Sequence, residues 1–328
     1  MTNLGIVGTG WISNSFAEGC ICTDQYRLTA VCSREIERAE AFGKQFGASL
    51  FFTDVDEMAA NSSVDVVYIA SPNAMHYEQC LAVLRARKHV IVEKPAFSNN
   101  TQAKTAFELA HKQGVFLFEA IRSIHEENYQ IVKREIANLG SIFGASLSFM
   151  QRSSRYDRLL SGEEPNVFSL RYSGGALMDI GVYLVYAAID WFGMPLASQY
   201  ICKKLCTGVD GSGVILLHYS DFDVILNVNK TCNSWLPSEI RGSEKTLLLD
   251  AVQYIRSIEL MEHSPSSTQL AKPSTVHWLE DEARCFVNLI NGNTSQSYEA
   301  LRDLALDVHT LITKLRLQAG IVFPADKT

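Results

Sequence analysis

A lysine at the end of an apolar run is the first candidate for proton-transfer chemistry. The triplet Glu93-Lys94-Pro95 follows His89–Val92, a run typical of a buried strand. Lys94 could donate or accept a proton, especially if partial burial lowers the pKa of its ammonium group. Glu93 could hold that ammonium in place, and Pro95 restricts the residue before it to extended geometry, which aims the lysine side chain. The alternative is an ordinary surface turn.

A carboxylate and a phenol form the second candidate group. A glycine pair opens a helical pattern at Gly174–Trp191, and Asp179 and Tyr183 lie four residues apart in it, hence on one helical face. A phenol beside a lysine ammonium suits proton transfer, and a carboxylate one turn back can orient either group. The alternative is an aspartate near a helix start and a tyrosine in the core. We take Lys94, Asp179 and Tyr183 as the catalytic candidates.

A glycine-rich turn lies where the first apolar strand meets the first helical pattern. Gly8 permits a tight turn and Gly10 lets a phosphate approach the backbone, while the helix start offers free N–H groups and a positive dipole end. The third position of such a turn is usually Gly or Ala and is Ser13 here. The alternative is a merely structural turn. We expect the pyrophosphate of a dinucleotide to bind at Gly8, Thr9, Gly10, Trp11 and Ile12.

The residues after the second strand bear on the choice of cofactor. Tyr26–Cys32 is followed by Ser33 and Arg34, with Arg38 one helical turn further on. An NAD site typically carries a carboxylate here for the ribose 2′-hydroxyl, whereas a guanidinium and a hydroxyl suit a 2′-phosphate. Glu35 complicates this interpretation, and solvated arginines at a helix start are the alternative. We favour NADP(H) over NAD(H).

The elements that must position these residues change in character along the chain. Up to residue 120, short apolar runs alternate with helical patterns, which predicts a doubly wound parallel sheet, a Rossmann fold. Later segments such as Ile142–Met150 are apolar or alternating with fewer helices, which predicts an α+β domain with an open, mostly antiparallel sheet. Ser264–Ser274 is expected to be a loop. We therefore expect a dinucleotide-binding domain at 1–120 and a domain for substrate binding and oligomerisation at 121–328.

Composition and charge exclude several classes of function. The net charge is −7 and the pI about 5.7, and no basic stripe is evident, so we expect no nucleic-acid partner. No apolar run reaches the roughly 18 residues of a membrane span, and no signal peptide precedes the first strand pattern. The eight cysteines are scattered without zinc-site spacing, so we expect reduced thiols, a cytoplasmic location and no metal.

Four motifs in order along the chain resemble a known family. They are the glycine turn, the segment 70–76 (Ala-Ser-Pro-Asn-Ala-Met-His), Glu93-Lys94-Pro95, and Gly-Gly-x-Leu-x-Asp-x-Gly-x-Tyr from Gly174. Together they resemble the glucose–fructose oxidoreductase / inositol dehydrogenase / MocA (Gfo/Idh/MocA) family over nearly the full length, and Ile240–Lys245 is similar to the strand-turn-strand of its second domain. The fold of that family is a Rossmann domain followed by a domain with an open, mostly antiparallel sheet.

The resemblance implies roles for individual residues. Lys94 would be the catalytic lysine, with Asp179 and Tyr183 beside it at the substrate. Many members have His where Tyr183 stands, and the tyrosine form is more similar to the dihydrodiol dehydrogenase branch. Arg122 stands where an aromatic residue is expected in that branch, which argues against an aromatic diol and admits a more polar or anionic substrate. The further residues expected at the cofactor are Ser71, Asn73, His76, Glu93, Lys94 and Arg122.

These patterns lead to one favoured reaction and two alternatives. We expect hydride transfer between NADP(H) and a hydroxyl or carbonyl carbon of a small-molecule sugar, polyol or diol, with Lys94 and Tyr183 as proton-transfer groups. The alternatives are a non-catalytic NADP(H)-sensing regulator and a reductase of a C=N or tetrapyrrole substrate. The alternating run Val224–Asn229 predicts an apolar sheet face, which we expect to form a homodimer interface.

Overall fold

The computed structural model describes residues 1–262, 266–274, 276–292 and 295–327. The chain forms two compact units: unit 1 comprises Met1–Arg122 and Thr275–Leu306, and unit 2 comprises Ser123–Ser274 and Asp307–Thr328. The boundary expected after residue 120 falls close to the first division. The expectation of one continuous second domain is wrong, because a C-terminal segment returns to unit 1.

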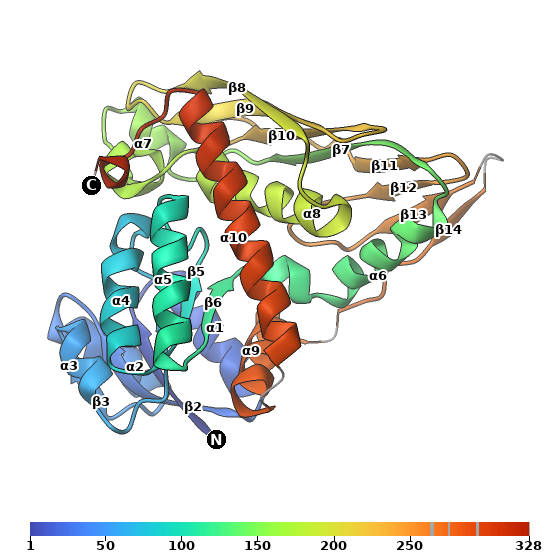
Figure 1. The fold of residues 1–328 in the computed structure, drawn as a ribbon. Coiled ribbons are helices and arrows are strands. Elements are labelled where there is room, and N and C mark those ends of the chain that lie inside the picture. The colour runs from blue at the N-terminus through green and yellow to red at the C-terminus, as the bar shows by residue number, and fades with distance from the viewer. Residues whose placement is uncertain (263–265, 275, 293–294, 328) are drawn as a thin grey trace. The chain divides into compact units, whose positions relative to one another are not determined.

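Unit 1 is built on a six-stranded parallel sheet in the order β3-β2-β1-β4-β5-β6. Figure 1 draws these strands in colours from blue to green. All four residues of β4 are buried, as expected for a strand that is covered by helices on both faces. The strand order reverses between β1 and β4, and ligands of such sheets bind outside the carboxyl ends of the strands at this point. The doubly wound sheet is therefore confirmed. Its strands are β1 (Thr2–Val7), β2 (Tyr26–Cys32), β3 (Leu50–Phe52), β4 (Val66–Ile69), β5 (His89–Glu93) and β6 (Leu117–Ala120).

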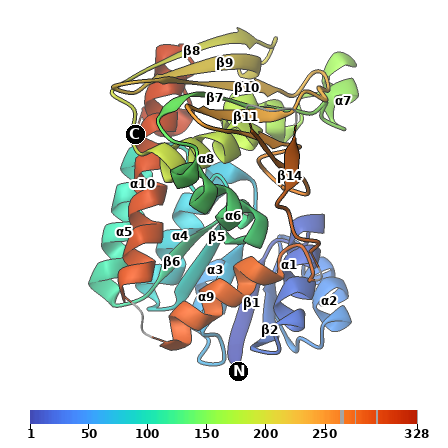
Figure 2. The same cartoon turned by 90° about the vertical axis from the view of Figure 1, so that its right-hand side faces the viewer.

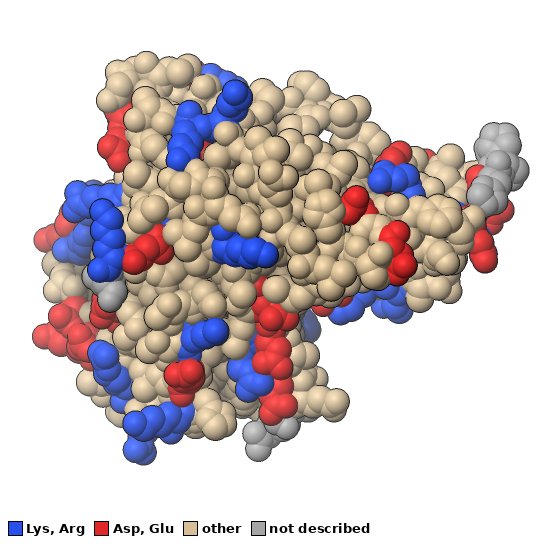
Figure 3. Space-filling view, turned by 45° about the horizontal axis from the view of Figure 1, so that its top comes forward, with Lys and Arg blue, Asp and Glu red and all other residues tan. Residues whose placement is uncertain are grey.

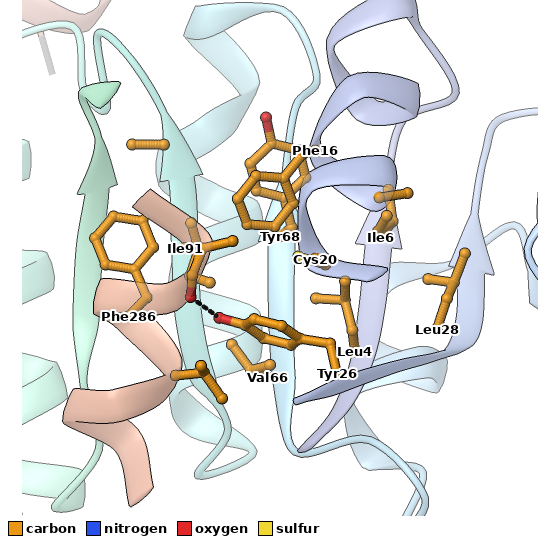
Figure 4. Packing of buried hydrophobic residues seen from close by; sticks show 14 of the residues in the cluster. Leu4, Ile6, Phe16, Cys20, Tyr26, Leu28, Val66, Tyr68, Ile91 and Phe286 are labelled. Atoms are coloured by element: carbon orange, nitrogen blue, oxygen red, sulfur yellow. Dashed lines mark hydrogen bonds between the residues drawn. The ribbon is translucent and has the colours of Figure 1, made fainter. Parts of the chain in front are cut away.

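One helix of unit 1 comes from the far end of the chain. This helix, α9, packs beside α1, where a Cβ on Gly19 would lie 3.0 Å from the carbonyl carbon of Leu279. The ring of Phe286 from α9 stacks on Phe118 of β6 with centroids 4.6 Å apart, so α9 completes the core on this face (Figure 4). The helices of unit 1 are α1 (Trp11–Cys22), α2 (Ile36–Gln45), α3 (Val55–Ala60), α4 (His76–Arg85), α5 (Asn100–Gln113), α9 (Glu280–Gly292) and the first part of α10 (Ser295–Gln318).

Unit 2 contains an eight-stranded sheet in the order β14-β13-β12-β11-β7-β10-β9-β8. Its strand pairs are antiparallel except for β7 with β10, which confirms the mostly antiparallel sheet. The apolar helix α8 lies along one face (Figure 2), and β10 accordingly buries Val224, Leu226 and Val228 but exposes Ile225. The strands are β7 (Ile142–Met150), β8 (Ala197–Lys204), β9 (Asp210–His218), β10 (Asp223–Asn229), β11 (Ser238–Gly242), β12 (Thr246–Leu249), β13 (Ile258–Met261) and β14 (Ser267–Gln269).

Shorter elements complete the fold. The loop expected at Ser264–Ser274 contains β14, and its residues 264 and 265 lie outside the described residues. The remaining helices are α6 (Glu127–Glu135), α7 (Tyr156–Leu160), a π-helical turn (Leu177–Gly181) and α8 (Val182–Phe192). The 3₁₀ turns are η1 (Asn73–Met75), η2 (Arg122–His125), η3 (Ile136–Asn138), η4 (Asn166–Phe168), η5 (Leu170–Tyr172) and η7 (Pro324–Asp326).

The surface carries charges of both signs, and one helical stretch in the interior is long and apolar. On the face that Figure 3 shows, Lys and Arg side chains are interspersed with Asp and Glu. Within the described part of the chain, one helical stretch, Leu170–Phe192, has the length and hydropathy of a membrane span. Of its apolar window 78% is buried inside the fold, which is how the core helix of a domain looks.

Candidate active site

The glycine turn in unit 1 has the geometry of an anion-binding loop. Gly8 has a φ of +98°, and a Cβ there would lie 2.8 Å from the carbonyl oxygen of Ala70, so only glycine fits. Gly10 is the N-cap of α1, and a Cβ on it would meet nothing within 4 Å. Within the described residues no side chain caps α1, and its first turn holds no acidic residue. The uncapped first amides and the positive dipole end of α1 therefore fit a pyrophosphate.

The end of β2 lies directly beside this turn. The amide of Gly8 donates to the carbonyl oxygen of Cys32 at 2.9 Å, which places Ser33 and Arg34 next to the glycines. Arg38 donates through Nε to Glu35 at 2.8 Å, and both side chains are exposed. No ion pair of Arg34 is found among the residues that the structure describes. Glu35 is thus occupied by Arg38, while Arg34 faces solvent at the position where an adenosine 2′-phosphate would lie.

The carboxyl end of β4 is tied to the turn that follows β5. The ring of His76 is fully buried, with Nε2 at 2.8 Å from the carbonyl oxygen of Ser71 and Nδ1 at 3.2 Å from that of Pro95. Burial lowers the pKa of His76, so the neutral ring has one N–H to donate. The ring therefore holds the Pro95 turn from inside, and the expected contact of His76 with cofactor stays a prediction. Ser71 donates to Gln79 at 2.6 Å, and Asn73 opens η1 at the same edge.

The Glu93-Lys94-Pro95 triplet leaves the sheet at the carboxyl end of β5. The hydroxyl of Tyr68 donates to Glu93 Oε1 at 2.5 Å, and the amide of Lys94 donates to Glu93 Oε2 at 3.2 Å. Burial raises the pKa of Glu93, and the charge of Lys94 and the Tyr68 hydrogen bond oppose that rise. On the next strand, Glu119 accepts from the amide of Ala96 at 3.0 Å. The backbone on which Lys94 stands is therefore held by both neighbouring strands.

Two tryptophans and an arginine meet at the same edge of unit 1. Trp11, which is 69% exposed, stacks on Trp278 with centroids 5.9 Å apart and an interplanar angle of 13°. The guanidinium of Arg122 lies 5.0 Å from the centroid of the Trp278 ring. Trp278 comes from the C-terminal segment of unit 1. Trp278 lies beside the glycine turn because the chain returns to unit 1. No pattern in the neighbouring sequence predicts this return.

In unit 2, Asp179 is paired with a lysine that the sequence analysis missed. Lys230 follows the last residue of β10, is 5% exposed, and forms an ion pair with the carboxylate of Asp179. The ring of Phe168 lies 5.9 Å from Lys230 Nζ. A lysine directly after a buried apolar strand is the only signal that could have pointed to this pair. Burial of this kind requires a partner, because an unpaired charge in the interior is costly.

The start of the helix that carries Tyr183 is fixed by a buried carboxylate. Asp210 accepts from the amide of Leu177 and from the hydroxyl of Tyr200, both at 2.6 Å. Gly175 has a φ of +123°, and a Cβ on it would lie 2.1 Å from Asp210 Oδ1, which explains the glycine. Asp179 lies in the π-helical turn that follows, and such turns are frequent at functional sites. Tyr183 lies at the beginning of α8, and its ring centroid is 5.9 Å from that of Phe149 on β7.

The structure thus assembles two groups of candidates. The glycine turn, Ser33, Arg34 and Lys94 share one edge of the sheet in unit 1, and Arg122 stands at the end of β6 on the same edge. Asp179 and Tyr183 share one helical segment of unit 2. No group of three or more His, Cys, Asp or Glu side chains that could hold a metal ion is found among the described residues.

The chain is similar to several known oxidoreductases. The model of the oxidoreductase family with an NAD-binding Rossmann fold (GFO_IDH_MocA) matches residues 2–121. The scyllo-inositol 2-dehydrogenase (NADP(+)) IolU of Bacillus subtilis is 36% identical over 327 residues, with 100% of both chains covered. The trans-1,2-dihydrobenzene-1,2-diol dehydrogenase of Mus musculus is 30% identical over 228 residues, 66% of this chain and 64% of that protein.

Solved structures show the same fold. The 3-ketoreductase KijD10 from Actinomadura kijaniata, in complex with NADP and TDP-benzene, superposes with a TM-score of 0.82 at 23% identity over 97% of both chains. The full-length match to IolU and the four motifs in their expected order lead to one assignment. The chain belongs to the Gfo/Idh/MocA family of oxidoreductases.

Proposed function

We propose that this protein transfers a hydride between NADP(H) and a hydroxyl-bearing carbon of a polyol or sugar. The observation that carries the proposal is the position of Lys94 at the carboxyl end of β5, on the same sheet edge as an uncapped, glycine-built helix start. A sensor of the cofactor would have no use for a lysine held there by its neighbours. Full-length similarity to a scyllo-inositol dehydrogenase makes scyllo-inositol the first substrate to test.

NADP(H) is the cofactor that the residues after β2 favour. A fork of guanidinium donors suits the 2′-phosphate, and no carboxylate occupies the place of Ser33 or Arg34. The neighbouring Glu35 is in an ion pair with Arg38 and so does not repel the phosphate as an isolated charge would. The name of IolU, which specifies NADP(+), supports the same choice.

The residues of this chain would bind the substrate and move its proton. The nicotinamide, when bound, supplies the hydride acceptor or donor. In the oxidative direction Lys94 or Tyr183 takes the proton of the substrate hydroxyl, and in the reductive direction the same group returns it. Asp179, held by Lys230, orients this proton transfer. A positioned general acid or base accounts for roughly 10²–10⁴-fold in rate.

The test is turnover of scyllo-inositol with NADP⁺, followed by the absorbance of the reduced cofactor. Lys94→Met and Tyr183→Phe should each lower kcat by roughly 10²-fold or more while NADPH binding persists. Full turnover in Lys94→Met would refute the proton-transfer role of the lysine. Tight NADPH binding without turnover of any polyol, sugar, diol or imine would favour a sensing role instead.

A further inference from the structure

A buried tyrosine behind Glu93 has no role in the proposed reaction as described so far. Tyr68 lies on β4, is fully buried, and stacks its ring on Phe16 of α1 with centroids 3.9 Å apart and an interplanar angle of 7° (Figure 4). A phenylalanine would fill this site equally well, so packing alone does not require the hydroxyl. The hydroxyl instead donates to Glu93 Oε1 at 2.5 Å.

The strands bring these two side chains to one face of the sheet. Tyr68 is paired in register with Ile91 on the neighbouring strand β5, and both belong to the core under α1 and α9. Glu93 follows Ile91 by two residues and so projects from the same face. The Glu93 carboxylate therefore lies within hydrogen-bonding reach of the Tyr68 hydroxyl. Glu93 is also the residue that precedes Lys94 in the chain.

We propose that Tyr68 is a positioning residue whose buried hydroxyl holds the Glu93 carboxylate ionised and oriented toward Lys94. The proposal rests on the proposed function, in which Lys94 is a proton-transfer group. Hydrogen bonds from a neutral donor to a carboxylate are among the stronger ones, and they favour the ionised form. Without the hydroxyl, Glu93 would keep its desolvated site but lose a donor that stabilises its charge.

The charges around this pair act in opposite directions. Facing Glu93, Lys94 lowers the pKa of the carboxyl and Glu119 on β6 raises it, while burial makes the largest contribution and also raises it. Behind Tyr68, burial, Glu93, Glu282 of α9 and the Cys20 thiol of α1 all raise the pKa of the phenol. The phenol therefore stays neutral throughout the working range and acts as a donor only.

The sign of the pH dependence follows from these contributions. The hydrogen bond from Tyr68 lowers the pKa of Glu93, so Tyr68→Phe raises it. If the ionised Glu93 is needed for the reaction, activity is lost as the pH falls through that pKa. The acid limb of the profile for kcat/KM in the reductive direction should then move to higher pH by about one unit, with the limb at high pH unchanged.

A second buried tyrosine supplies a matched control. Tyr26 belongs to the same core cluster, and its hydroxyl donates to the carbonyl oxygen of Ala283 at 2.9 Å (Figure 4). Tyr26→Phe thus removes one buried hydrogen bond of the same core but none to Glu93. It should lower the stability about as much as Tyr68→Phe does, and it should leave the acid limb in place.

The experiment compares pH profiles of kcat/KM for the reduction by NADPH of the ketone that oxidation of scyllo-inositol yields. NADPH binding is measured as a check of folding. Tyr68→Phe should shift the acid limb and Tyr26→Phe should not. In a Glu93→Gln background, the further change Tyr68→Phe should have no effect on the profile. An unshifted limb in Tyr68→Phe, or an added shift on top of Glu93→Gln, overturns the inference. Full activity of Lys94→Met, measured in parallel, would instead overturn the proposed function on which this inference rests.

Discussion

Replacement of Arg34 by alanine should separate the affinity for NADPH from that for NADH. Arg34 is exposed beside the glycine turn, while its neighbour Arg38 is in an ion pair with Glu35 at 2.8 Å. A hydrogen bond between charged groups contributes about 1.5–3 kcal/mol, and the exposure of Arg34 places the loss at the low end. A loss of about 1.5–2 kcal/mol corresponds to roughly 10- to 30-fold weaker NADPH binding.

The assay is a fluorescence titration, for which Trp11 and Trp278 beside the turn are intrinsic donors. Binding of NADH should change by no more than about twofold in Arg34→Ala, because NADH has no 2′-phosphate. The matched control is Arg38→Ala, which removes an arginine from an exposed pair worth about 0–1 kcal/mol. Equal weakening of NADPH and NADH would refute the 2′-phosphate site. A larger effect at Arg38 than at Arg34 would refute the choice of Arg34 as its main ligand.

Three further predictions concern the turn, the buried ion pair and the sheet. Gly8→Ala should abolish NADPH binding while the protein stays folded by circular dichroism, since the new Cβ meets the Ala70 carbonyl and the φ of +98° adds strain of about 1–3 kcal/mol; retained binding would contradict it. Lys230→Met should lower the free energy of unfolding in urea toward the lower end of roughly 3–5 kcal/mol, and adding Asp179→Asn should restore part of it. We propose that the exposed face of the unit 2 sheet forms a homodimer: gel filtration should give a dimer mass that Ile225→Asp converts to a monomer mass, and a monomer mass for the unmodified chain refutes this.

Much of unit 1 could be predicted because its signals are local. A glycine turn between strand and helix patterns, an apolar run at Val66–Ile69 and periodic helices depend on residues within a few positions of each other. Ligands of such sheets bind outside the carboxyl ends of the strands, and this places Lys94 near the turn without further information. In unit 2 the glycine pair marked the start of a helix correctly, although the first turn is π-helical. Asp210, which accepts from the amide of Leu177 there, lies in a strand some thirty residues later.

The partners of these residues could not be predicted from local patterns. Trp278 reaches the glycine turn, and Lys230 reaches Asp179, through contacts between segments far apart in the chain. His76 was expected along the cofactor, but its ring is buried and contacts the carbonyl oxygens of Ser71 and Pro95. The hydroxyl of Tyr68 finds Glu93 only when two parallel strands are in register.

The division has a physical reason. Turn chemistry and hydrophobic period act over a few residues, so the fold class and the catalytic candidates could be predicted from local patterns. Pairing across the sheet and packing of α9 depend on closure of long loops, for which the local pattern carries no record. These long-range contacts set the position of each functional group and hence its charge state.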